Sequence, residues 1–202
     1  MNGNTEAQEL KDRLSLIETM ISEGRRTTES WGWTFVLWGV AYYVAIAWSV
    51  WDRSGLAWPI TMIAAGVLTS IVASRQTHRK PETTIGRAMG AIWLAMGISM
   101  FLLFMSMGIS GKFDERAFVA AMGAMLGMAN ATSSIILKWK MQFACAVVWW
   151  GAAVVGCFAS LTASRIVFVV AIFVCQIMFG LYSMIREARG RRQKANWGAA
   201  NA

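Results

Sequence analysis

The sequence predicts an all-α integral membrane protein with six transmembrane helices, preceded by a cytoplasmic amphipathic helix. Hydrophobic residues make up 56% of the 202 positions and charged residues only 15%, against about 25% in a typical soluble domain. The charges are segregated and leave six apolar blocks: 33–51, 58–74, 85–107, 116–137, 141–161 and 165–185. Each block has about 17 to 23 residues, the length that a membrane-spanning helix needs. We therefore expect three parts: a cytoplasmic helix over 1–30, a six-helix transmembrane domain over 31–186 and a basic tail over 187–202.

Lysine and arginine are unevenly distributed between the segments that join these blocks. Fifteen of the 19 fall on the side that holds both termini, and Arg53, Lys112, Arg116 and Arg165 fall on the other. The positive-inside rule places the richer side in the cytoplasm, so both termini are predicted to be cytoplasmic. The first 30 residues lack the apolar core of a cleavable signal peptide, so the first span is the expected membrane signal. Topology accounts for the net charge of +8, and no nucleic-acid partner is expected.

Residues 5–30 are predicted to form an amphipathic helix. Leu10, Leu14, Ile17 and Ile21 are spaced by four, three and four residues, which puts them on one face. A helix that lies on an anionic membrane has a basic polar face, whereas this segment is acidic through most of its length. We therefore expect its apolar face to contact protein, either a second copy of the chain or a cytoplasmic partner. The alternative is that the helix folds back on the protein's own cytoplasmic loops.

Tryptophans mark the two ends of the first span. Trp31 and Trp33 lie at one end and Trp48 and Trp51 at the other, positions typical of the aromatic belts at the two membrane surfaces. A short external turn then leads into the second span, which returns to the inner side and ends before a polar loop. The third span carries a stripe of glycines beside a stripe of methionines: Gly86, Gly90 and Gly97, and Met89, Met96, Met100 and Met107.

The fourth span is expected to lie at the centre of the bundle. Gly123, Gly127, Asn130 and Ser134 are spaced by four, three and four residues and share one helix face. In lipid, small residues let a second backbone approach closely, and an asparagine can form a hydrogen bond across the contact. Residues 138–140 then predict a very tight inner turn into the fifth span.

A weak internal repeat indicates how the spans are arranged. Each even span has a glycine followed three residues later by a polar residue, and each odd span has a tryptophan near a glycine. A repeat of about 55 to 60 residues favours three helical hairpins around a pseudo-threefold axis, with the even spans at the centre. Chance is the competing explanation, because the chain holds 18 glycines and 11 tryptophans. The candidate polar interior face is Thr69, Gly123, Gly127, Asn130, Ser134, Gln176, Gly180 and Ser183.

No constellation of catalytic residues is visible. The single histidine, His78, lies in a polar loop with no His or Cys at ligand spacing, and no span carries Asp, Glu, Lys or Arg away from its ends. Proton-coupled transporters need such a group at membrane depth. We therefore expect a non-enzymatic protein with no cofactor and no metal. A small-solute channel or transporter, lined by the polar members of the interior face, is the alternative. Hydrogen bonds between helices are the simpler reason for those side chains.

Two short motifs on consecutive spans provide another alternative. Met96 and Met100 form an MxxxM, and Gly123 and Gly127 form a GxxxG. The pair resembles copper(I) transporters of the high-affinity uptake type, in which stacked thioethers pass a soft ion. Those transporters have three spans and methionine-rich external tails, which this sequence lacks, and methionine is also a common packing residue.

The basic tail lies directly at the inner surface of the membrane, where each Lys or Arg attracts anionic lipid by about 1 kcal/mol. Anchoring of the last helix to anionic lipid is sufficient to explain this cluster. Its members are Arg186, Arg189, Arg191, Arg192 and Lys194.

The run LIETMISEGRRTTESWGWTFVLWGVAYYVAIAW, within roughly residues 14–48, resembles the start of a family of small uncharacterised bacterial six-span membrane proteins. In that family an amphipathic Ile/Met helix with an arginine pair precedes a first span that contains Trp-Gly. Members often occur beside small transcriptional regulators, so the resemblance implies a sensing or signalling role, and it assigns no active residue. We therefore predict a signalling, regulatory or scaffold module that contacts a cytoplasmic partner.

Overall fold

The computed structural model describes residues 3–52, 55–77 and 84–200, and the regular elements in these ranges are all helices. In order they are α1 (Gly3–Ser30), α2 (Gly32–Trp51), α3 (Ala57–Thr77), α4 (Thr84–Ile109), α5 (Glu115–Leu137), α6 (Lys140–Phe158), α7 (Leu161–Ile172), the π-helical turn η1 (Phe173–Met178) and α8 (Phe179–Ala200). Arg53, His78 and the side chains of residues 3–7, 23–30, 76–77, 191 and 194–200 lie outside the described set.

Six of the described helices are long and apolar enough to cross a membrane, with α7, η1 and α8 counted together as the last. Their bounds follow the six apolar blocks closely except between the fifth and the sixth. The fifth block was expected to reach residue 161 and the sixth to begin at 165, whereas α6 ends at Phe158, Ala159 is extended and α7 begins at Leu161. The Ser160 hydroxyl then accepts the Ala163 N–H (3.3 Å) and caps α7. The predicted bounds were wrong here because residues 158–161 contain no charge and no proline that would mark the end of a helix. The basic segment from 187 continues the last helix as far as Ala200.

The antiparallel contact between α5 and α6 is the most extensive between the described helices. A Cβ atom on Gly123 would lie 2.7 Å from the carbonyl oxygen of Trp149, and one on Gly156 would lie 3.0 Å from the backbone nitrogen of Ala120. Larger side chains would hold the two backbones apart, so glycine permits this packing. Lys138, with φ at 49°, closes the turn between the two helices in the left-handed conformation.

A second close contact joins α2 to the last span. A Cβ atom on Gly32 would lie 2.9 Å from the carbonyl oxygen of Gly180, and one on Gly180 would lie 2.9 Å from that of Gly32. Further along, a Cβ atom on Gly39 would lie 2.9 Å from the Cβ of Gln176. The residue Gln176 belongs to η1, the π-helical turn that interrupts the span. Such turns are rare and often occur at functional sites.

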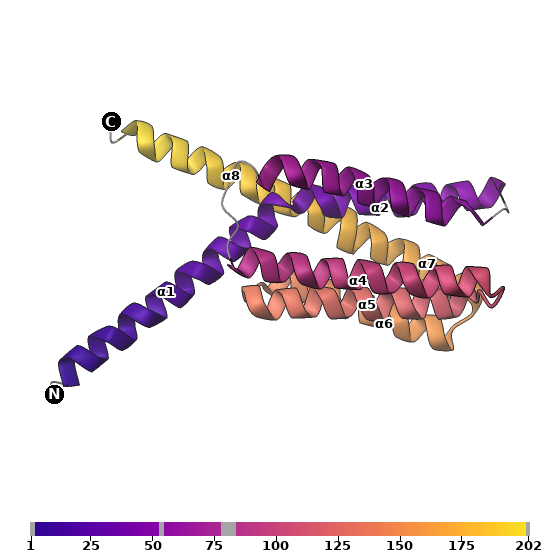
Figure 1. The fold of residues 1–202 in the computed structure, drawn as a ribbon, viewed down its shortest axis with the longest axis horizontal. Helices are drawn as coiled ribbons and strands as arrows, with labels where there is room; N and C mark the ends of the chain where they lie inside the picture. Colours follow the sequence, from indigo (N-terminus) through magenta and orange to yellow (C-terminus); the bar gives the residue numbers. More distant parts are fainter. Residues whose placement is uncertain (1–2, 53–54, 78–83, 201–202) are drawn as a thin grey trace.

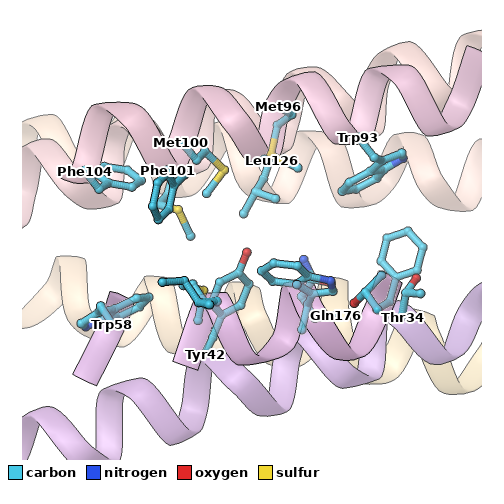
Figure 2. A pocket seen from close by; sticks show the side chains of 18 of the residues that line it. Thr34, Tyr42, Trp58, Trp93, Met96, Met100, Phe101, Phe104, Leu126 and Gln176 are labelled. Carbon is cyan, nitrogen blue, oxygen red and sulfur yellow. The ribbon is translucent and has the colours of Figure 1, made fainter. Parts of the chain in front are cut away.

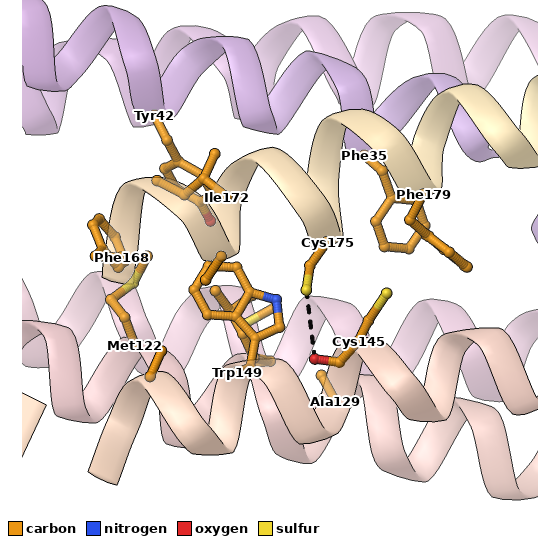
Figure 3. Packing of buried hydrophobic residues seen from close by; sticks show 14 of the residues in the cluster. Phe35, Tyr42, Met122, Ala129, Cys145, Trp149, Phe168, Ile172, Cys175 and Phe179 are labelled. Carbon is orange, nitrogen blue, oxygen red and sulfur yellow. Dashed lines mark hydrogen bonds between the residues drawn. The ribbon is translucent and has the colours of Figure 1, made fainter. Parts of the chain in front are cut away.

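The core fills the space between the α5–α6 hairpin and the last span (Figure 3). Trp149 is fully buried there and meets Phe168 edge to face, with ring centroids 6.1 Å apart. The Cys175 thiol donates to the Cys145 carbonyl oxygen at 3.6 Å, so these cysteines act as packing residues within the core. The α5 helix is the most buried of the six spans, and α3 and α4 are the least buried.

The remaining spans lie on two sides of the last one. The α3 helix packs mainly against α2, and α4 mainly against α5, with α7 running between the two groups (Figure 1). The α1 helix contacts α8, α4 and α5, while its N-terminal half projects away from the bundle. Both termini lie at the same end of the bundle, which we name the inner end; the opposite end is the outer end.

Candidate functional site

The residues of the predicted polar interior face lie on separate contacts. Gly123 and Gly127 face α6, whereas Gly180 and Ser183 face α2 near Gly32. Thr69 belongs to α3, which packs mainly against α2. Within the described ranges, these residues therefore do not share one face. The two helices of each predicted hairpin, α2–α3, α4–α5 and α6–α7, are in contact, and the pseudo-threefold axis stays a prediction.

Four of the five polar side chains of that face bond within their own helices, and Gln176 is the exception. Each of the four donates to a carbonyl oxygen three or four residues earlier: Thr69 to Ala65 (2.7 Å), Asn130 to Leu126 (2.8 Å), Ser134 to Ala131 (2.8 Å) and Ser183 to Phe179 (2.9 Å). We expected hydrogen bonds between helices at these positions. Close backbone approach at glycines holds the helices together there instead.

A large groove separates the two groups of helices, with α2 and α3 on one side and α4 and α5 on the other (Figure 2). Its volume is about 2400 Å³, well above the roughly 300–1,000 Å³ of most small-molecule pockets. The α4 residues that line it run from Gly86 to Ile109, a length of roughly 35 Å at 1.5 Å per residue. The groove therefore extends over a height comparable with the hydrocarbon core of a bilayer, about 30 Å.

Aromatic contacts join the two walls at two levels. Near the inner end, Phe35 of α2 meets Trp93 of α4 edge to face, with centroids 5.3 Å apart. Nearer the outer end, Trp58 of α3 meets Phe118 of α5 in the same way at 4.8 Å. These two pairs enclose a middle section of the groove, which we call the chamber.

Two polar side chains reach into the chamber from the same wall. Tyr42 is 4% exposed and Gln176 is 2% exposed, and both line the groove opposite Met96, Met100 and Leu126 (Figure 2). Within the described part of the chain, the Tyr42 hydroxyl and the Gln176 amide make no hydrogen bond, and neither is among the fully enclosed polar atoms, so both are open to the space of the groove. A polar group left without a partner in an apolar environment is unfavourable. The chamber is thus an apolar space with two unpaired hydrogen-bonding groups.

The charged residues that line the groove lie only near its ends. Arg87 and Glu187 are at the inner end. At the outer end, the Arg165 guanidinium binds both carboxylate oxygens of Glu115, at 2.6 and 2.7 Å, and so links α7 to α5. The middle of the groove is therefore uncharged.

Sequence reasoning named Gln176 but missed Tyr42. The position of Tyr42 could have indicated a functional role, because it lies in the middle of the first span, whereas tyrosine in membrane proteins concentrates at the two surfaces.

A second residue that was missed is Gln142, which is fully buried in α6 with both amide atoms unpaired within the described part of the chain. It does not line the groove.

The two motifs behind the copper(I) alternative lie on different surfaces. Met96 and Met100 are buried and line the groove, while Gly123 and Gly127 are covered by α6. The residues that the structure describes contain no group of three or more His, Cys, Asp or Glu side chains placed to hold a metal ion.

The candidate partner face of α1 is open. Leu10, Leu14 and Ile17 are 60, 53 and 52% exposed, and Ile21 is partly buried nearer the bundle.

In the basic tail, Arg186, Arg189 and Arg192 are exposed on α8, and the side chains of Arg191 and Lys194 lie outside the described set.

The fold thus defines an all-helical protein with six helices long and apolar enough to span a membrane, a bilayer-high groove and a projecting amphipathic helix, within the described residues. No family model matches the chain, and neither a curated protein nor a solved structure matches it. Any function must therefore be argued from the geometry of these surfaces.

Proposed function

We propose that the protein is a non-enzymatic membrane module with a signalling, regulatory or scaffold role, and that it contacts a protein partner in the cytoplasm through α1. The observation that carries this proposal is the exposed apolar face of α1. Leu10, Leu14 and Ile17 are each more than half exposed, on a helix that projects from the bundle. Apolar residues gathered on one exposed face are typical of a surface that another helix covers.

The charge of α1 favours protein over lipid as the occupant of this face. Its described polar side chains include Glu9, Asp12 and Glu18 against Lys11 and Arg13, and an acidic face is repelled by anionic lipid. The exposure of the apolar face does not support the alternative in which α1 folds back on the protein's own loops.

The proposal places both termini in the cytoplasm, in the inner membrane of a bacterium. Two observations support this orientation: the termini lie at the same end of the bundle, and that end carries most of the lysines and arginines. The exposed arginines of α8 then lie at the membrane surface, where they contact anionic lipid.

A channel or small-solute transporter through the even spans is the weaker candidate. Of its five expected polar lining residues, only Thr69 and Gln176 line the groove. The donors of Thr69, Asn130, Ser134 and Ser183 bond within their own helices. A pathway for a polar solute needs such groups to face a shared water-filled space.

Site-specific photo-cross-linking tests the partner contact. A photoreactive residue at Leu14 is expected to give a discrete product in membranes, whereas one at Thr19, on the opposite face of the same helix, gives none. A product of twice the 22.3 kDa chain mass identifies a second copy, and any other discrete mass identifies a different partner. The substitution Ile17→Asp should remove the Leu14 product. Equal products from both positions, or a Leu14 product that survives Ile17→Asp, would refute the proposal.

A further inference from the structure

We propose that the chamber binds an uncharged, lipid-soluble molecule with a carbonyl-bearing ring, of the quinone class. The chamber is the middle section of the groove, between the Phe35–Trp93 and Trp58–Phe118 pairs. This binding site is independent of the partner contact through α1.

The depth of the two polar groups excludes a simple acyl chain as the preferred occupant. Tyr42 lies at the middle of the 20-residue helix α2, roughly 15 Å from either end at 1.5 Å per residue. Phospholipids place their headgroups at the membrane surface and only hydrocarbon at this depth. A chain of methylene groups would leave the Tyr42 hydroxyl and the Gln176 amide unpaired, which is unfavourable in an apolar environment.

The chemistry of the chamber matches a neutral carbonyl compound. Both the Tyr42 hydroxyl and the Gln176 amide can donate a hydrogen bond, and the charged lining residues lie only at the two ends of the groove. Met96 and Met100 face the same space from α4, and thioethers make favourable contacts with flat rings. A ring carbonyl would therefore accept from Tyr42 and Gln176 while the ring packs against the methionines.

A helix of a second copy does not fit the same space. A helix with its side chains is about 10–12 Å wide, whereas the two walls touch through ring pairs with centroids 5.3 and 4.8 Å apart. A helix running the length of the groove would have to separate both pairs. A flat ring can enter between them, and its apolar tail can follow the rest of the groove.

Quenching of tryptophan fluorescence measures the binding directly, because Trp38, Trp58 and Trp93 line the groove. The probe is a decyl-substituted benzoquinone, titrated into the full chain in phosphatidylcholine nanodiscs. Tyr42→Phe and Gln176→Met should each weaken binding about three- to tenfold, the usual net effect of one hydrogen bond.

Two matched controls should leave the affinity unchanged. Tyr43→Phe removes a hydroxyl that donates to the Val169 carbonyl oxygen and belongs to a residue outside the groove lining, and Gln142→Met removes a buried amide that does not line the groove.

Decylbenzene, which has the ring and the chain but no carbonyl, should fail to displace the quinone. The proposal is overturned if the wild-type protein shows no saturable quenching, if decylbenzene competes, or if Tyr42→Phe behaves like Tyr43→Phe. Should Tyr42→Phe fail to give a monodisperse protein, the comparison of Gln176→Met with Gln142→Met decides the matter alone. Displacement of the quinone by excess phospholipid would instead identify an acyl chain as the occupant and would also overturn the proposal.

Discussion

Single glycines determine how closely the helices of this protein approach. The packing at Gly123 leaves no space for a methyl group, because a Cβ there would lie 2.7 Å from a backbone oxygen and 2.8 Å from a backbone nitrogen of α6. Backbone atoms cannot rotate out of the way as a side chain can. At Gly127 the nearest atoms belong instead to the Trp150 side chain, which is 40% exposed.

We therefore expect Gly123→Ala to lower the free energy of unfolding by about 1–3 kcal/mol, the usual cost of overpacking. Gly151→Ala is the matched control on the same hairpin, because nothing lies within 4 Å of its Cβ position. That change should be neutral or stabilising by up to about 1 kcal/mol, since alanine favours a helix. Thermal unfolding of the purified protein in detergent measures both variants. Equal melting temperatures would contradict the close contact.

At the scale of the helix, the start of α5 depends on one side chain. The carboxylate of Asp114 accepts hydrogen bonds from the N–H groups of Arg116 (2.7 Å) and Ala117 (3.1 Å), two of the four that a helix leaves unpaired at its N-terminus. Asp114→Ala should destabilise the protein by about 1 kcal/mol, whereas Asp114→Asn, which keeps a capping oxygen, should stay close to wild type. Denaturation in detergent distinguishes the two. A similar loss in both variants would show that charge, and not capping, matters there.

The helices themselves could be predicted well from the sequence, and their partners could not. Runs of about 20 apolar residues identify spans because a helix must satisfy its own backbone in lipid. Packing depends on which faces meet. Gly123 has its partner in the next helix, which local spacing favours, whereas Gly32 meets Gly180 from the far end of the chain. The repeat of glycine and polar residues therefore could not identify which helix faces meet.

The chamber could not be predicted from the sequence, for a related reason. Its two polar groups, Tyr42 and Gln176, belong to the first and last spans, far apart in the sequence. No spacing rule links residues so distant. The π-helical turn that holds Gln176 also contains no proline or glycine that would have indicated it.

At the scale of the whole molecule, both ends of the chain lie on one side of the bundle. In spheroplasts, from which the outer membrane has been removed, we expect epitope tags at the two termini to be inaccessible to antibodies, and a tag between Ser110 and Asp114 to be accessible. Permeabilising the inner membrane should expose all three tags. A terminal tag that is accessible in sealed spheroplasts would contradict the proposed orientation, and termini on opposite sides would contradict an even number of crossings.

The two glycine contacts differ in when they can form during synthesis. The α5–α6 hairpin joins neighbouring segments across a turn at Lys138, so it can assemble as soon as both have left the ribosome. The contact between Gly32 and Gly180 must wait until nearly the whole chain has been made. Until then, the first span lies in the membrane without the last span beside it. Assembly is complete only when the last span packs against the first.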